Sequence, residues 1–138
     1  MVAAAILQCA TPSPAADGFV VIVNPSVAGA SVHRKDLAAV FLKKALRWGD
    51  RTEALPVDQS GASPVREAFS ESVLQMPVST VLQYWQKRMF GVTPLRPPVL
   101  KASDAEVIAL VAKTPGAVGY VSPGAALSGG VKTVRVVD

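Results

Sequence analysis

The sequence predicts one small α/β domain, a three-layer sandwich in which helices flank a mostly parallel sheet. Short apolar, β-branched runs alternate along the chain with longer segments whose apolar residues recur at helical spacing. Half of the 138 residues are hydrophobic and only 17% are charged, a composition that supplies a core and excludes a disordered chain. This length suffices for one hydrophobic core, and we find no internal repeat.

Four segments have the composition of buried strands. Residues 19–23 form a continuous apolar run that ends at an Asn-Pro turn, which is typical of a strand buried on both faces. Residues 54–58, 117–121 and 131–137 have a similar character, the first with a proline near its start. Because helical segments separate these strands, we expect them to lie in one largely parallel sheet.

Four helices are expected between the strands. The second begins with Ser63 as N-cap and Pro64 at the first helical position. The fourth begins with a capping box, Ser103 to Glu106. The apolar faces of the four helices lie at Leu37, Val40 and Phe41; at Val65, Phe69, Val73 and Met76; at Val78, Val81, Leu82, Trp85 and Met89; and at Val107, Leu110 and Val111.

The formal net charge of +4 is concentrated in one segment. Residues 34–51 contain six basic residues against two acidic ones. Such a segment attracts anions or nucleic acid in some proteins, but it is more typical of a solvated helix face followed by a polar loop. No zinc-finger spacing or aromatic RNA-binding signature accompanies it. We therefore expect no nucleic-acid partner.

The sequence does not predict an enzyme. A hydrolase or transferase needs a nucleophile with a base, paired acids or metal ligands. The chain has one histidine and one cysteine. Ser63 has Asp58 and Glu67 nearby in the sequence, but neither is a base that suits it. We expect no catalytic residue, no cofactor and no metal.

Residues 1–18 are interpreted as the remnant of a signal peptide or as a disordered tail, with the folded domain at 19–138. An apolar stretch around Cys9 is followed by small residues suited to cleavage, but the basic start of a signal peptide is missing. A lipid-modified Cys9 is an alternative, although Gln8 is a poor residue before such a cysteine. No apolar run reaches the roughly 20 residues that span a bilayer. We expect a periplasmic or secreted protein without stable membrane insertion.

Three motifs in a fixed order resemble one protein family. Residues 37–48 contain Leu-x-x-Val-Phe-Leu-Lys-Lys followed by Arg-Trp, residues 60–69 contain a serine-rich loop and a helix, and residues 115–121 read Pro-Gly-Ala-Val-Gly-Tyr-Val. In this order the chain resembles the second lobe of the phosphate-binding proteins of ABC transporters, which have the type II periplasmic-binding-protein fold. The resemblance covers residues 20–137 and implies a non-catalytic solute-binding domain connected with phosphate transport.

The resemblance also implies an anion site at the start of the second helix. In the family, a Ser-Gly-Thr loop holds phosphate and an arginine just upstream pairs with its charge. Here Ser63 matches the serine. Pro64 and Val65 replace the glycine and the threonine, which removes an N–H donor and a hydroxyl. Gln59 stands where the arginine would be, and Arg66 either compensates for it or faces solvent.

One hypothesis for the function is therefore weak binding of phosphate or a related oxyanion. The predicted ligand-binding residues are Ser60, Gly61, Ser63 and Arg66, with Asn24 or Ser26 from the loop after the first strand. A helix start offers N–H donors to an anion, and the loops after parallel strands share one rim of a sheet. In a single lobe the ligand stays exposed, so contacts worth roughly 0–1 kcal/mol each predict millimolar affinity or weaker. The simpler role for Ser63 is helix capping alone.

A second hypothesis is a protein-interaction module that binds no small ligand. A lobe that evolved facing another lobe keeps a surface suited to pairing. That surface would bind a protein partner or a second copy of the chain.

Overall fold

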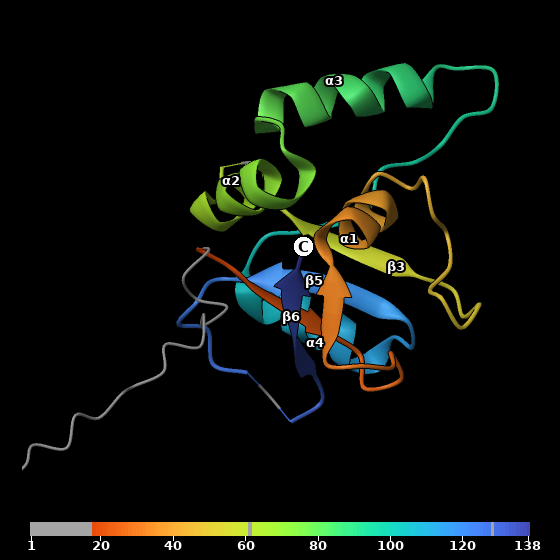
Figure 1. Ribbon diagram of the computed structural model, residues 1–138. Coiled ribbons are helices and arrows are strands. Elements are labelled where there is room, and N and C mark those ends of the chain that lie inside the picture. The colour runs from red at the N-terminus through yellow and green to blue at the C-terminus, as the bar shows by residue number, and fades with distance from the viewer. Residues whose placement is uncertain (1–17, 61, 128) are drawn as a thin grey trace, which may run out of the picture.

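One mixed sheet with helices on both sides makes up the domain (Figure 1). The structure, a computed structural model, describes residues 18–60, 62–127 and 129–138. The predictions that fall on residues 1–17, Cys9 among them, and on Gly61 lie outside the described residues. The strands are β1 (Val20–Val23), β2 (Ser31–His33), β3 (Leu55–Gln59), β4 (Val99–Lys101), β5 (Ala117–Val121) and β6 (Lys132–Val137). The helices are α1 (Arg34–Phe41), α2 (Pro64–Phe69), α3 (Val78–Met89) and α4 (Asp104–Lys113), and a π-helical turn, η2 (Ser70–Leu74), continues α2.

The strands lie in the order β2-β6-β1-β5-β3-β4. β3 runs parallel to β4 and β5, and β2 runs parallel to β6. β1 runs antiparallel to both of its neighbours, with Val20 opposite Val121 and Val23 opposite Val118 in β5. The prediction of a mostly parallel sheet is confirmed, with this central strand as the exception. The carboxyl end of β1 therefore lies beside the amino ends of β3 and β5. The loop after β1 leaves the sheet at the opposite end from the loops after β3 and β5.

All four predicted strands and all four predicted helices are present, and β2 and β4 are additional strands. Each of these two is three residues long and largely exposed, so neither has an apolar run that would reveal it. β4 pairs with the end of β3, from Val57 to Gln59, and forms one edge of the sheet. β2 forms the other edge.

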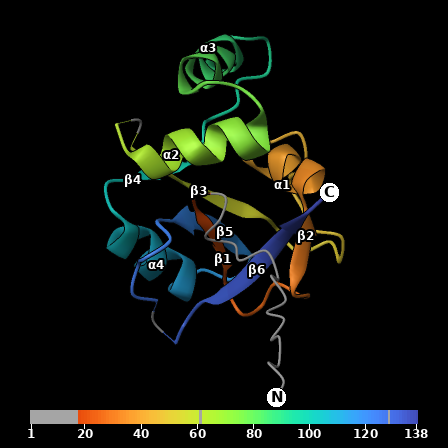
Figure 2. The same cartoon turned by 60° about the vertical axis from the view of Figure 1, so that its left-hand side comes forward.

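Helix α4 covers one face of the sheet, and α1, α2 and η2 cover the other, which gives the predicted three layers (Figure 2). On the α4 side, Ile22 and Val57 pack against Val107 and Val111. The helix approaches β5 closely at Gly119, where an added Cβ would lie only 2.7 Å from Val107 Cγ1. A glycine is therefore needed in this strand for α4 to pack.

An aromatic cluster fills the other side of the sheet. Phe69 of α2 is 1% exposed, and its ring centroid lies 4.0 Å from that of Tyr120, 4.7 Å from that of Phe41 and 5.4 Å from that of Phe19. Burial of large rings of this kind dominates core energetics. Phe69 thus joins α2 to β5, to the end of α1 and to the residue just before β1.

Helix α3 packs outside this layer and is the element farthest from the sheet in both views (Figures 1 and 2). It buries Val81 and Trp85 on its inner side. No helix in the described part of the chain is long and apolar enough to cross a membrane.

Candidate oxyanion site

The serine-rich loop lies at the carboxyl end of β3, where the chain turns into α2. The backbone N–H of Ser60 donates to the carbonyl of Lys101 at 3.0 Å, and the N–H of Ser63 donates to the carbonyl of Ser60 at 3.0 Å. Ser63 occupies the N-cap position with extended backbone angles, but its side chain accepts no capping hydrogen bond. With described residues, neither serine hydroxyl makes a hydrogen bond. Both half-buried side chains therefore keep their hydrogen-bonding capacity.

Asn24 and Ser26 do not join this loop. Because β1 runs antiparallel to β5, the loop after β1 lies where β5 begins. The Ser26 hydroxyl accepts a hydrogen bond from the N–H of Gly116 at 2.9 Å, and the Asn24 amide donates to the carbonyl of Val111 at 2.9 Å. Asn24 thus secures the end of α4. The expectation that these two residues share a rim with Ser60 and Ser63 is wrong, since it assumed a parallel first strand.

Arg66 takes neither of its two predicted positions. Its side chain is only 7% exposed and turns from α2 towards the end of β3. Nη1 donates to the carbonyl of Gln59 at 2.9 Å, and Nη2 lies 3.6 Å from Oδ2 of Asp58. The guanidinium therefore belongs to a buried ion pair and is not an open charge beside the serine loop.

Asp58 is the centre of a buried polar cluster. Its Oδ1 accepts hydrogen bonds from the Tyr120 hydroxyl and from the N–H of Gln59, the latter at 3.0 Å. Burial raises the pKa of Asp58, although the charge of Arg66 and both hydrogen bonds act against the rise. Burial and the nearby carboxylate also raise the pKa of Tyr120, so this phenol stays protonated and donates.

Gln59 extends the cluster to the other face of the sheet. Its amide nitrogen donates to Oδ1 of Asp104 at 2.7 Å and to the carbonyl of Tyr120 at 3.0 Å. The same carboxylate oxygen accepts from the N–H of Ser122 at 3.1 Å. Burial alone would raise the pKa of Asp104, but these hydrogen bonds together lower it. Gln59 stands at the position where the resemblance implies an arginine. Its side chain is thus bonded to Asp104 and to the Tyr120 carbonyl and does not point to the serine loop.

Sequence reasoning missed this set, the Asp58 cluster. Its members are Asp58, Gln59, Arg66, Tyr120 and Asp104. One signal was available: an acidic residue at the end of an apolar strand needs a partner when it is buried. A second was the position of Arg66 three residues before the buried Phe69, which places both on one side of α2.

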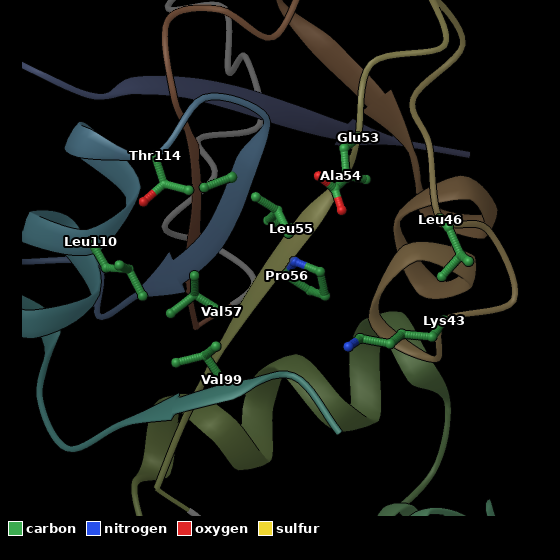
Figure 3. Close-up of a pocket in the computed structure, with 11 residues that line it drawn as sticks. Lys43, Leu46, Glu53, Ala54, Leu55, Pro56, Val57, Val99, Leu110 and Thr114 are labelled. Atoms are coloured by element: carbon green, nitrogen blue, oxygen red, sulfur yellow. The ribbon is translucent and has the colours of Figure 1, made fainter. Parts of the chain in front are cut away.

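Two cavities lie beside the β3–β4 edge, one on each face of the sheet. The first, of about 290 Å³, borders the Asp58 cluster, and its walls are Asp58, Arg66, Leu82, Trp85, Gln86, Met89, Pro97, Pro98 and Leu100. The second, of about 240 Å³, lies on the α4 side between Val57, Val99 and Leu110 (Figure 3). Lys43 and Leu46, from the segment after α1, also line it, and the side chain of Lys43 extends towards it (Figure 3).

The described residues include no group of three or more histidine, cysteine, aspartate or glutamate side chains that could hold a metal ion.

A single sheet covered by helices in this order is one lobe of a substrate-binding protein fold. No family model matches the chain, and no curated protein matches its sequence. Solved structures do match. The chain aligns with an ABC-type phosphate transport receptor from Vibrio cholerae at a TM-score of 0.61 and 20% identity, over 85% of this chain and 45% of that one.

Two further structures agree. A putative phosphate ABC transporter substrate-binding protein with bound phosphate from Clostridium perfringens has a TM-score of 0.62 and 18% identity, over 88% of this chain and 46% of that one. PstS from Borrelia burgdorferi has a TM-score of 0.64 and 15% identity, over 94% of this chain and 55% of that one. The chain spans about half the length of these proteins. At such identities the likeness establishes the fold, and the predicted resemblance is confirmed at that level.

Proposed function

We propose that this chain is a non-catalytic solute-binding domain that binds phosphate or a related oxyanion weakly at the loop between β3 and α2. The observation that carries the proposal is the pair of serine hydroxyls at Ser60 and Ser63, half-buried and without a hydrogen bond to any described residue. Gly61, which lies outside the described residues, stays in the proposed site as a prediction from the sequence. The fold shared with phosphate-binding proteins favours an oxyanion as the ligand.

The binding is weak for two physical reasons. Arg66 is paired with Asp58, so an oxyanion at the loop gains little from its charge. Ser60 and Ser63 are only half-buried, and each polar contact that stays exposed to water contributes roughly 0–1 kcal/mol, so the sum corresponds to millimolar affinity. A high-affinity receptor would enclose the ion between two lobes.

Isothermal titration with phosphate tests this proposal. We expect saturable binding in the millimolar range, and loss of that binding in the double variant Ser60→Ala/Ser63→Ala. Ser26→Ala also removes a serine hydroxyl, but at the opposite end of the strands, and serves as the matched control. Equal effects of the two changes, or no binding by the wild type, would rule the site out.

Phosphate uptake would place such a domain outside the cytoplasmic membrane. The matched proteins from Vibrio cholerae and Clostridium perfringens are described as parts of phosphate ABC transport systems. We therefore propose a periplasmic or secreted location. Fractionation of cells expressing the full chain tests it, and recovery in the cytoplasm alone would contradict it.

A protein-interaction role is the second candidate, and one observation favours it. Phe90 is 84% exposed and Val92 is fully exposed after α3, while Leu100 of the edge strand is 56% exposed. Exposed apolar side chains and an open strand edge are each typical of a pairing surface. The occupant we propose is a second copy of the chain. Light scattering tests this role, since a monomer at high concentration would exclude it.

A further inference from the structure

The cavity beside the Asp58 cluster differs from an ordinary gap between helices. Its upper wall is α3, with Leu82, Trp85 and Met89, and its lower wall is Leu100 of β4. These walls are apolar, and Trp85 is 4% exposed, so the indole is held firmly in place. A volume of about 290 Å³ is at the small end of the range for ligand pockets in proteins.

Two charged side chains meet at one end of this cavity. Oδ1 of Asp58 accepts hydrogen bonds from Tyr120 and Gln59, while Oδ2 accepts none from any described residue and lies 3.6 Å from Nη2 of Arg66. Nη1 of Arg66 is likewise used by Gln59. In the described part of the chain, no fully buried side-chain nitrogen or oxygen lacks a hydrogen-bond partner. Asp58 and Arg66 both line the cavity, so we place the remaining atoms of the pair at its wall.

The pair selects ligands by charge. Arg66 attracts an anion such as phosphate, but Asp58 repels it from almost the same place, and a cation meets the reverse situation. A neutral group avoids both repulsions. If it carries an N–H next to a carbonyl oxygen, it donates to Asp58 and accepts from Arg66 at the same time. A carboxamide has this arrangement on one edge.

We propose that this cavity binds a small uncharged molecule with a planar apolar body and a carboxamide-like head. The head contacts the Asp58–Arg66 pair, and the body packs against Trp85 and Leu100. This site is separate from the serine loop, so it goes beyond the oxyanion function and does not depend on it. Its polar groups are fixed before the ligand arrives, because the Asp58 cluster holds them on both sides.

The test uses three ligands of the same shape and different charge: benzamide, benzoate and benzamidine. The chain has two tryptophans, so the fluorescence of Trp85 is measured alone in a Trp48→Phe variant. We expect a saturable change with benzamide in the millimolar range, and binding of the two charged analogues at least about fivefold weaker. Equal or tighter binding of benzoate or benzamidine, or no saturation with benzamide, overturns the proposal.

A matched pair of variants locates the site. Leu82, 51% exposed, lines this cavity, while Leu46, 58% exposed, lines the cavity on the opposite face of the sheet (Figure 3). Both exposed leucines tolerate lysine, so each variant should fold. We expect Leu82→Lys to weaken benzamide binding about tenfold and Leu46→Lys to leave it unchanged. An equal effect of both changes overturns the assignment to this cavity.

A change of charge at the Asp58–Arg66 pair provides an independent test. Asp58→Asn leaves Arg66 as the one charged residue among the described residues that line the cavity, so the preference should shift from benzamide towards benzoate. An unchanged preference in a folded Asp58→Asn protein contradicts the proposal. The double variant Ser60→Ala/Ser63→Ala should leave benzamide binding unaffected, which separates a failure of this proposal from a failure of the oxyanion site.

Discussion

Replacing Arg66 by methionine isolates the energetic role of the buried ion pair. Methionine keeps much of the apolar stem of the arginine, so the main loss is the guanidinium. Asp58, 9% exposed in its side chain, then has a buried carboxylate without a counter-charge, and the carbonyl of Gln59 loses its donor at 2.9 Å. Removing one partner of a buried pair costs about 3–5 kcal/mol. Since Tyr120 and the N–H of Gln59 still hold Asp58, we expect the lower end of that range.

Denaturant unfolding of four proteins measures this effect: the wild type, Arg66→Met, Asp58→Asn and the double variant. In the double variant no buried charge is left unpaired, so part of the stability should return. We expect a coupling free energy of about 1–3 kcal/mol between the two sites. A loss below about 1 kcal/mol for Arg66→Met, together with additive single effects, would mean that Arg66 faces solvent and the reasoning fails.

Three further predictions follow from the fold and the cluster. Phe69→Ala should lower the free energy of unfolding by about 3–5 kcal/mol, because it leaves a cavity in the core. Phe90→Ala, at an 84% exposed site, should change it by less than about 0.5 kcal/mol. Equal denaturation midpoints of the two variants would contradict the placement of Phe69 in the core. Gly116→Ala should destabilise the folded state by about 1–3 kcal/mol, because Gly116 has a φ of +82° and the new Cβ would lie against the carbonyl oxygen of Glu53. Thermal unfolding measures this loss, and an unchanged stability would contradict the left-handed conformation at Gly116. Because burial raises the pKa of Asp58, the folded state holds this proton more tightly than the unfolded state, and stability should fall as the pH rises from near 3.8 through the raised pKa. Asp58→Asn should remove that part of the stability profile, and an identical profile in both proteins would contradict the assignment.

Much of the fold is readable in the sequence because its elements carry strong local signals. The apolar run at 20–23 is a strand buried along its whole length, and Ser103 caps α4 as predicted, accepting a hydrogen bond from the N–H of Glu106 at 3.3 Å. The direction of β1 was not predictable, since an apolar run buried on both faces looks the same whichever way it pairs. Because β1 was assumed to be parallel, Asn24 and Ser26 were predicted at the wrong end of the strands.

The candidate site was harder to predict than the fold. Ser63 was correctly placed at the start of α2, but the direction of the Arg66 side chain depends on a carboxylate that is close only after the sheet has formed. Long-range pairs of this kind leave no periodic pattern in the sequence. The glutamine in place of the expected arginine was also informative only in the structure, where Gln59 bonds to Asp104 across the sheet.

An NMR titration with phosphate tests the location of the oxyanion site most directly. Amide resonances are followed residue by residue, with chloride at equal ionic strength as the reference. We predict saturable shifts at the amides of Ser60, Ser63 and Val65, with those of Asn24 and Ser26 unmoved. Shifts centred on the loop after β1, or no saturable shift at the start of α2, would contradict an oxyanion site at the carboxyl end of β3.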